Sequence, residues 1–278
     1  MSGLIHFLNG KFISEDKLVI SPRDLGFSRG CAVHEFVVTN NNQPFKLSEH
    51  IERLFKSAEI IGLKIPWNKI QIVDWAKETF DKNDKNTEKT MRIFLTGGKS
   101  DSMRYAKVPT LIMIVSPRIR KQSSDYEKGI KIKAVKYRRP YPEAKTNIYI
   151  EGVKQLSEAG NERIEEIIYY DESQVYEGAG SSLFAIINSE LVTAKSDIIE
   201  GITRNTLLQI LHLPIAIEVR NFTFDELQHA SEVFLTGSNS EVRGVIEING
   251  KSIGNGKVGN ITKEVLEQYR EYILQTIN

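Results

Sequence analysis

The sequence has little cysteine and almost no net charge. Cys31 is the only cysteine, so no intramolecular disulfide can form, and 37 Lys and Arg residues balance 36 Asp and Glu residues to a formal net charge of +1. Non-specific binding to nucleic acid or to an anionic membrane requires a concentrated cationic field. We therefore expect neither nucleic acid nor membrane as a partner.

Long hydrophobic runs are also missing. No run approaches the roughly 20 apolar residues that a bilayer span needs, and no apolar stretch typical of a secretion signal follows Met1. With 40% hydrophobic residues over 278 positions, the chain can still bury a core that needs no disulfide or metal to fold. We expect a cytoplasmic protein.

The sequence lacks the short motifs of several enzyme classes. Its five histidines are scattered, without an H-E-x-x-H pattern or a cysteine pair, so no metal site is expected. There is no G-x-S-x-G nucleophile elbow and no P-loop lysine motif. The nearest match to a dinucleotide-binding fingerprint, at residues 178–182, lacks the third glycine. Zinc enzymes, serine hydrolases, P-loop enzymes and dinucleotide-binding enzymes are therefore disfavoured.

Apolar periodicity predicts both helices and strands. Asn9-Gly10 is typical of a β-hairpin turn because both residues tolerate positive φ. Residues 47–63 have the periodicity of a helix with Ser48 as its N-cap, and residues 68–80 that of a second helix with Ile70 inward. Strands outnumber helices without a regular βαβ alternation, so we expect an α+β fold. The other expected elements are a loop feeding a strand at 24–39, strands at 91–96, 110–116, 130–136, 165–171, 231–236 and 242–248, a hairpin at 183–194, a helix at 202–212 and a last helix capped by Asn260.

The length predicts two lobes, since a single core seldom grows beyond about 250 residues. Residues 117–125, PRIRKQSSD, begin with proline, are mostly polar and lack apolar periodicity, which is typical of a linker. We place an N-terminal lobe at residues 1–117, a linker at 118–124 and a C-terminal lobe at 125–278.

Six segments together suggest a site for a carbonyl cofactor that bears a phosphate. Such a cofactor needs a lysine for a Schiff base, a carboxylate that keeps a ring nitrogen protonated, and an anion cradle of arginine and helix-start amides. In chain order the segments are DLGFSRGCAVHEFVV (24–38), HIERLFKSA (50–58), AKTNIYI (144–150), EGAGSSLF (177–184), GITR (201–204) and FLTGSNSEVRGV (234–245).

The six segments resemble motifs of the fold-type IV, or class IV, pyridoxal-phosphate enzymes. This family includes branched-chain aminotransferases, D-amino-acid aminotransferases and aminodeoxychorismate lyases. The resemblance implies a two-lobed α+β fold, with pyridoxal 5'-phosphate bound between the lobes and the Schiff-base lysine in the C-terminal lobe. It also implies a homodimer.

The resemblance assigns residues to the cofactor. It implies that Lys145 forms the Schiff base and moves a proton between substrate Cα and cofactor C4′, and that Glu177 faces the pyridine nitrogen. It implies that Arg53 binds the phosphate. Each of these residues also has a purely structural alternative. Lys145 can be a surface lysine, Glu177 an exposed glutamate in a turn, and Arg53 an exposed helical arginine paired with Glu49 or Glu52. The other cofactor residues implied are Ile202 and Thr203 through backbone amides, Ser238 through its hydroxyl, and Tyr149 beside the ring.

Several positions depart from the family pattern. Leu25 and Gly97 stand where the family has arginine, and Ser182 stands where it has asparagine. His34 occupies the position of an aromatic residue that lines the family's substrate pocket, and a polar imidazole there argues against a purely aliphatic pocket.

Two arginines are alternative candidates for the substrate carboxylate. Arg92 aligns with a carboxylate-handling arginine of branched-chain enzymes, and Arg104 suits a D-amino-acid reading, while either can also be a surface residue. The substrate candidates are His34, Arg92, Arg104 and Asn239.

We expect a pyridoxal-phosphate-dependent aminotransferase that moves the amino group of a branched-chain or similar L-amino acid to 2-oxoglutarate. Three alternatives stay open: an aminodeoxychorismate lyase that releases pyruvate and 4-aminobenzoate, a D-amino-acid aminotransferase, and a non-catalytic protein of the same fold. The expected partners are a small amino acid or aminochorismate substrate and a 2-oxo acid acceptor.

Overall fold

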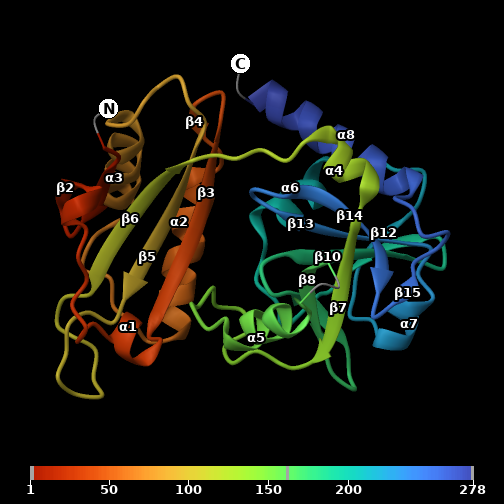
Figure 1. The fold of residues 1–278 in the computed structure, drawn as a ribbon, viewed down its shortest axis with the longest axis horizontal. Helices are drawn as coiled ribbons and strands as arrows, with labels where there is room; N and C mark the ends of the chain where they lie inside the picture. The colour runs from red at the N-terminus through yellow and green to blue at the C-terminus, as the bar shows by residue number, and fades with distance from the viewer. Residues whose placement is uncertain (1–2, 161–162, 277–278) are drawn as a thin grey trace. The chain divides into compact units, whose positions relative to one another are not determined.

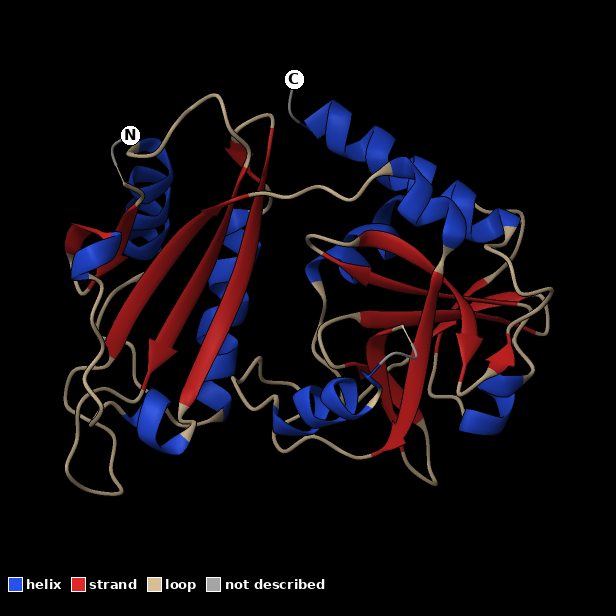
Figure 2. Cartoon of the chain, in the orientation of Figure 1, coloured by secondary structure: helices blue, strands red, loops and turns tan. Residues whose placement is uncertain are grey.

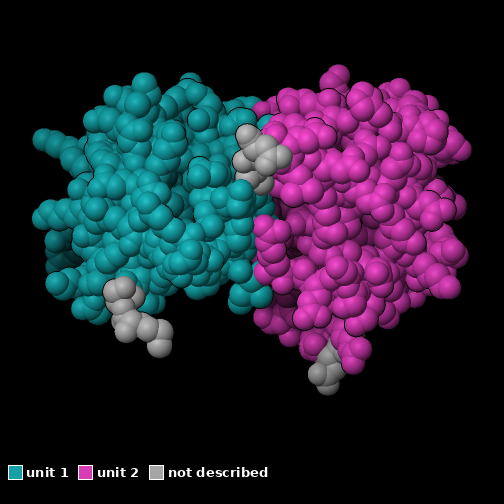
Figure 3. All heavy atoms as spheres, turned by 90° about the horizontal axis from the view of Figure 1, so that it is seen from above, with its two compact units in different colours: residues 1–119, 143–148, 277 teal, residues 120–142, 149–276, 278 magenta. Residues whose placement is uncertain are grey.

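The computed structural model describes residues 3–160 and 163–276 and divides them into two units (Figure 3). The first unit contains the residues up to 119 and also residues 143–148, and the second contains residues 120–142 and those from 149 onward. The chain therefore leaves the first unit, returns to it with the lysine segment and leaves it again. Sheets form the body of each unit, and helices lie against them (Figure 2).

The lysine segment is the main difference from the lobes expected from the sequence, which placed residues 143–148 in the second lobe. Backbone hydrogen bonds explain their place in the first unit. The His34 amide donates to the Lys145 carbonyl at 2.9 Å, and the Asn147 amide donates to the Ala32 carbonyl at 3.2 Å. Local composition gives no sign of these bonds, because they join positions more than 100 residues apart.

The first unit is built on an antiparallel six-stranded sheet (Figure 1). Its first two strands form the predicted hairpin, whose turn residues Asn9 and Gly10 have φ of 47° and 86°. The predicted strands at 91–96 and 110–116 are confirmed. In order across the sheet the strands are β2 (Lys11–Ser14), β1 (Ile5–Leu8), β6 (Thr110–Pro117), β5 (Lys89–Thr96), β3 (Ala32–Asn40) and β4 (Gln43–Pro44).

Two helices bury their apolar sides against one face of this sheet, α2 (Leu47–Ile60) and α3 (Lys69–Asp81). The expected N-cap Ser48 is wrong, because it lies inside α2 and Lys46, at φ 49°, precedes the helix. The expected inward position of Ile70 is also wrong. Its side chain is 73% exposed, whereas Ile72 is fully buried. The short helix α1 (Leu25–Arg29) lies where a loop was expected, and η1 (Glu15–Lys17) was not predicted.

The second unit contains a mixed nine-stranded sheet. The predicted strands and the hairpin about Asn188-Ser189 are confirmed, and both hairpin residues have positive φ. Parallel pairs join β7 to both of its neighbours, and antiparallel pairs dominate elsewhere. In order the strands are β12 (Ile217–Val219), β11 (Glu190–Thr193), β10 (Ser182–Ile187), β13 (Glu232–Gly237), β14 (Glu241–Ile248), β7 (Ile130–Lys136), β8 (Ile164–Tyr170) and β9 (Val175–Gly178), with β15 (Lys251–Ser252) paired to β14.

The helices of the second unit include two that the sequence predicted. The expected N-cap Asn260 is wrong, because it is the first residue of the last helix. The Glu232 carboxylate instead accepts from the backbone amides of Ile261 and Thr262 at 3.1 and 2.8 Å. The mixture of helices and strands confirms the α+β class. No helix of the described residues is long and apolar enough to cross a membrane. The helices are α4 (Ser123–Lys128), α5 (Ile150–Glu158), α6 (Ile202–Ile210), α7 (Phe224–Gln228) and α8 (Asn260–Thr276).

Candidate active site

The backbone of Lys145 is held from two sides within the first unit. Its carbonyl accepts from the His34 amide of β3, and its amide donates to the Ser57 hydroxyl of α2 at 3.0 Å. Ser57 is fully buried, so its hydroxyl has few alternative partners. The Lys145 side chain is half-buried. A reactive amine at this position therefore extends from a rigid anchor.

Arg53 lies beside this anchor and forms a buried ion pair with Glu35 of β3. Its Nε and Nη2 atoms donate to the two Glu35 carboxylate oxygens at 2.8 and 2.7 Å. The Arg53 side chain is 10% exposed and that of Glu35 is fully buried. The alternative of an exposed helical ion pair with Glu49 or Glu52 is therefore wrong, since those two residues pair with lysines instead.

His50 completes this cluster. Its Nδ1 atom lies 2.7 Å from Glu35 Oε2, and the residue is 1% exposed. Because an ionised carboxylate only accepts hydrogen bonds, His50 Nδ1 carries the proton and donates. The side chains of Glu35, His50 and Arg53 thus connect β3 and α2, and that of Ser57 connects α2 to the lysine segment.

The cluster shifts the pKa values of its members. Burial opposes ionisation of Glu35, but the charge and hydrogen bonds of Arg53 and the hydrogen bond of His50 outweigh it and hold the pKa of Glu35 well below its usual range. Burial lowers the pKa of His50, and the Glu35 carboxylate opposes this shift only in part. Burial, followed by the charge of Lys145, lowers the pKa of His34 to about 3. At neutral pH the carboxylate is charged and both imidazoles are neutral.

The opposite face of the same strands holds two substrate candidates. His34 stacks on Phe94 with ring centroids 5.8 Å apart, and the Arg92 guanidinium lies 5.9 Å from the Phe36 ring. The strand register pairs His34 with Phe94 and Phe36 with Arg92, so all four side chains share one face. The structure therefore brings His34 and Arg92 together.

Arg104 lies away from these strands, in the loop between β5 and β6. It is exposed and lines a cavity of about 430 Å³. This loop cavity is lined by Leu25, Arg29, Cys31, Met103, Arg104 and Tyr105.

In the second unit, Glu177 is a buried residue at the end of β9. Its Oε1 atom accepts from the Ile199 amide at 3.1 Å and also from the Arg139 guanidinium. The side chains of Glu177 and Arg139 are 5% and 9% exposed. Arg139 further donates to the Pro142 carbonyl at 2.9 Å. The alternative of an exposed turn glutamate is therefore wrong.

The GITR turn begins α6 with no side-chain cap. Gly201 is the N-cap residue, and Ile202 and Thr203 follow it as buried residues of the first turn. The first amides of a helix have no intrahelical partners and lie at the positive end of its dipole, which suits an anion. A Cβ atom on Gly201 would lie 2.4 Å from Ser182 Oγ, so a side chain there would force the Ser182 hydroxyl to move.

The turn that carries Ser238 lies beside this helix start. Ser182 pairs with Thr236 across β10 and β13, and residues 238–240 form the next turn. The Thr236 hydroxyl is buried, with no hydrogen-bond partner among the described residues. The structure thus gathers Glu177, the start of α6 and the Ser238 turn in one part of the second unit.

Two further candidates have less defined settings: Tyr149 precedes α5 as its half-buried N-cap residue, and Asn239 lies in the turn after Ser238.

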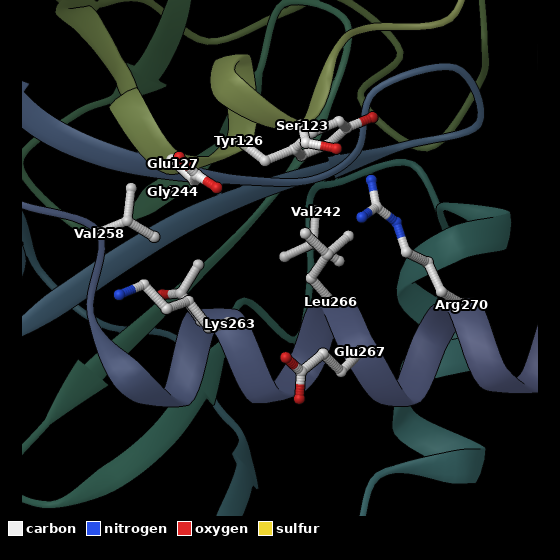
Figure 4. Close-up of a pocket in the computed structure, with 11 residues that line it drawn as sticks. Ser123, Tyr126, Glu127, Val242, Gly244, Val258, Lys263, Leu266, Glu267 and Arg270 are labelled. Carbon is white, nitrogen blue, oxygen red and sulfur yellow. The ribbon is translucent and has the colours of Figure 1, made fainter.

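A second cavity, of about 370 Å³, lies between α4, β14 and α8 (Figure 4). The view shows Leu266 and Arg270 pointing from α8 toward the other two elements. Arg270 packs 4.4 Å from the Tyr126 ring and pairs with Glu241. None of the residues predicted for the site lines this cavity. Among the described residues, no cluster of three or more His, Cys, Asp or Glu residues could hold a metal ion.

The described side chains have the chemistry that a phosphate-bearing pyridine aldehyde requires. The second unit supplies a buried carboxylate, a helix start without a side-chain cap and a buried hydroxyl without a partner. The first unit supplies an amine on a fixed backbone and an oriented guanidinium. Each of these groups is of a chemical type that pyridoxal 5'-phosphate requires, which points to the class of pyridoxal-phosphate enzymes.

Comparison with known proteins identifies the family within this class. Residues 32–248 match the family described as amino-transferase class IV. A putative branched-chain-amino-acid aminotransferase of Methanocaldococcus jannaschii is 31% identical over 277 residues, 95% of each chain. A D-alanine aminotransferase of Staphylococcus aureus is 27% identical over 280 residues, 96% of this chain and 97% of the relative. The chain belongs to the class IV aminotransferase family.

A solved structure supports the same conclusion for the fold. The branched-chain aminotransferase of Thermoproteus uzoniensis with norvaline has a TM-score of 0.87 and 26% identity to this chain, and the match covers 98% of this chain and 95% of the other. Class IV aminotransferases are transferases that use pyridoxal 5'-phosphate, and the enzyme described here shares that cofactor.

Sequence reasoning assigned no role to several residues that complete the geometry. Glu35, His50 and Ser57 lie inside the two motif segments at 24–38 and 50–58, so the motifs contained the signal. Arg139 lies outside all six segments, and no local pattern identifies it.

Proposed function

We propose that the protein transfers the amino group of a branched-chain or similar L-amino acid to 2-oxoglutarate. Lys145 carries this proposal, because a lysine whose backbone is fixed by His34 and Ser57 suits repeated proton transfer at one place. The archaeal relative at 31% identity is a putative branched-chain-amino-acid aminotransferase and supports this substrate class. So does the Thermoproteus uzoniensis enzyme, whose structure was determined with norvaline.

Each proposed cofactor residue has a defined task. Arg53, the amides of Ile202 and Thr203, and the Ser238 hydroxyl would hold the phosphate, since all of them donate hydrogen bonds to anions. Glu177 would accept from the protonated pyridine nitrogen. When bound, pyridoxal 5'-phosphate withdraws electrons from the substrate Cα and so acidifies its proton.

Lys145 is the proposed base for that Cα proton. Its Nζ atom would hold the cofactor before substrate arrives. Once released as a neutral amine, it would accept the Cα proton and become an ammonium. His34 beside it is neutral at pH 7 and adds no charge near this amine. His34, Phe94 and Arg92 would contact the substrate, with Arg92 on its carboxylate.

A D-amino acid is the second candidate substrate. The Staphylococcus aureus D-alanine aminotransferase is 27% identical to this chain. The Arg104 cavity, which also contains Arg29, offers cationic groups for a carboxylate there. In this alternative Arg104 replaces Arg92 as the carboxylate partner.

The absorbance spectrum of the protein with pyridoxal 5'-phosphate tests these proposals. L- and D-amino acids are added singly, without an acceptor. We expect L-leucine, L-isoleucine or L-valine to convert the cofactor to pyridoxamine 5'-phosphate, and 2-oxoglutarate to reverse the conversion. A response to D-alanine alone would favour the second candidate. If the cofactor binds but no amino acid converts it, aminodeoxychorismate and release of pyruvate are tested next.

Lys145→Ala provides the control for this experiment. We expect this variant to lose the conversion by every amino acid while it keeps its melting temperature within about 2 °C, because the hydrogen bonds that anchor residue 145 are made by its backbone. Conversion at the wild-type rate in this variant would contradict the assignment of Lys145.

We also propose that the enzyme acts as a homodimer in the cytoplasm. Analytical ultracentrifugation checks the first statement, and a monomer at micromolar concentration would contradict it. Fractionation of cells that produce the protein from its own gene checks the second.

A further inference from the structure

We propose that Glu35 is a positioning residue that orients Arg53 for the cofactor phosphate. This inference rests on the proposed role of Arg53 and goes beyond it, because Glu35 itself would touch neither cofactor nor substrate. The observation behind it is the buried ion pair between β3 and α2, in which the charged groups of Glu35 and Arg53 meet through two hydrogen bonds.

The two-bond geometry fixes the plane of the guanidinium. A guanidinium has one edge formed by Nε and one terminal nitrogen, and a second edge formed by the two terminal nitrogens. Glu35 accepts from Nε at 2.8 Å and from Nη2 at 2.7 Å, which occupies the first edge. The second edge then points in a direction set by Glu35, and its parallel donors match two oxygens of a phosphate.

His50 fixes the carboxylate in turn. Glu35 Oε2 accepts from both Arg53 Nη2 and His50 Nδ1, each at 2.7 Å. Rotation of the carboxylate about its last bond would break both contacts at once. Because the imidazole is neutral at pH 7, His50 contributes orientation to this array and no charge.

The same two elements also hold Lys145. The residue before Glu35 donates its amide to the Lys145 carbonyl, and Ser57, one turn after Arg53 on α2, accepts from the Lys145 amide. The hydrogen bonds that the Glu35 carboxylate of β3 accepts from α2 therefore set the position of Arg53 relative to the Lys145 backbone. In addition, the Glu35 charge offsets that of Arg53 between two buried side chains.

A purely structural ion pair would have a different effect from a positioning pair. Loss of a structural pair weakens the whole first unit and lowers the affinity for every ligand. Loss of a positioning pair lowers the affinity only for ligands that carry a phosphate. Pyridoxal and pyridoxal 5'-phosphate differ only in this group, so the ratio of their affinities measures the orientation of Arg53.

The experiment compares these two ligands on the cofactor-free protein by absorbance titration. Glu35→Gln places an amide donor against the donors of Arg53 and His50, which forces the guanidinium away from its observed plane. We expect the affinity for pyridoxal 5'-phosphate to fall at least about tenfold and that for pyridoxal to change less than about twofold. Glu52→Gln, the same chemical change on the exposed side of α2, should alter neither affinity.

Two further variants keep the test decisive. Glu35→Asp retains the charge that Arg53 needs in a buried site but shortens the side chain, so it folds even if Glu35→Gln does not, and it should show the same selective loss to a smaller degree. Arg53→Lys removes the guanidinium edge, and Glu35→Asp added to it should cause no further selective loss. Non-additivity of this kind identifies one shared interaction.

Several results would overturn the inference. An equal loss of affinity for both ligands in the Glu35 variants would make the pair structural, and an unchanged or higher affinity for pyridoxal 5'-phosphate would show that Glu35 does not orient Arg53. These results are independent of the proposed reaction. If the wild-type protein binds the cofactor but transfers no amino group, the proposed function fails while the affinity ratio still tests Glu35.

Discussion

Two buried charged residues at the candidate active site are held by residues of opposite charge. The side chains of Arg53 and Glu177 are each paired with an opposite charge at 10% exposure or less. A buried charge that loses its partner is destabilising by about 3 to 5 kcal/mol, because it can no longer regain its hydration. The partners Glu35 and Arg139 are therefore as important for the state of the site as the residues that would touch the cofactor.

Arg139→Met tests this argument in the second unit. Without the guanidinium, Glu177 stays buried without the opposite charge that Arg139 supplies, and we expect the free energy of unfolding to fall by about 3 kcal/mol. Urea denaturation measures the change. Arg138→Met is the matched control, since its pair with Asp197 is solvent-exposed, and it should lose less than about 1 kcal/mol. Similar losses in the two variants would contradict the argument.

At the scale of elements, the start of α8 depends on a side chain from another strand. Glu232 of β13 accepts from the amides of Ile261 and Thr262 and from the Thr262 hydroxyl at 2.7 Å. A carboxylate at this position both satisfies the first amides of the helix and interacts favourably with its dipole. The cap thus connects the longest helix of the second unit to its sheet.

Glu232→Gln should remove much of this stabilisation. We expect the free energy of unfolding to fall by about 1 to 2 kcal/mol, measured by chemical denaturation with helix content as the signal. Glu267→Gln changes an exposed carboxylate on the same helix and serves as control. A loss in the control as large as that in Glu232→Gln would show that general charge on α8, and not capping, is responsible.

Local sequence patterns predicted those helices, strands and turns whose own residues carry the pattern. The Asn9-Gly10 hairpin and the strand at 130–136 follow from turn chemistry and from apolar runs. The helices α1, α4 and α7 span six residues or fewer, which leaves too little periodicity to separate them from loops. Ile70 and Ile72 are both apolar and lie two positions apart on α3. Sequence periodicity therefore does not show which of them is buried, and only packing decides it.

The candidate site could be predicted from the sequence where its residues lie within the motif segments. Lys145, Glu177 and the start of α6 lie at the matched positions, and their roles stay predictions. The pairing of Arg53 with Glu35 joins residues 18 apart, and that of Arg139 with Glu177 joins residues 38 apart. Such pairs depend on which strand lies beside which helix, and no local sequence pattern contains that information.

For the whole molecule, the buried histidines determine how stability responds to acid. The pKa of His34 is lowered from 6.5 to about 3, and burial also lowers those of His6 and His50. Between these two pH values the unfolded chain binds a proton at His34 that the folded protein does not bind. The contribution of His34 to stability is therefore fully present above pH 6.5 and is lost as the pH falls from 6.5 toward 3.

His34→Phe should reduce this loss. We expect the difference in free energy of unfolding between pH 7 and pH 5 to be smaller in the variant than in the wild type, and His6 and His50 to account for the remainder. Glu35 does not contribute in this range, because its lowered pKa affects stability only below its usual value of 4.5. Urea denaturation at the two pH values measures the difference, and an unchanged pH dependence would contradict a neutral buried His34.

The return of residues 143–148 to the first unit affects how the chain is synthesised. A ribosome releases the last strand of the first sheet, which ends at Pro117, before it releases the segment that pairs with residues 32–34 of β3. At 5 to 20 residues per second, the intervening stretch takes about one to five seconds to translate. During this time that part of β3 is an open sheet edge, which another nascent chain can pair with. The arrival of Lys145 closes it.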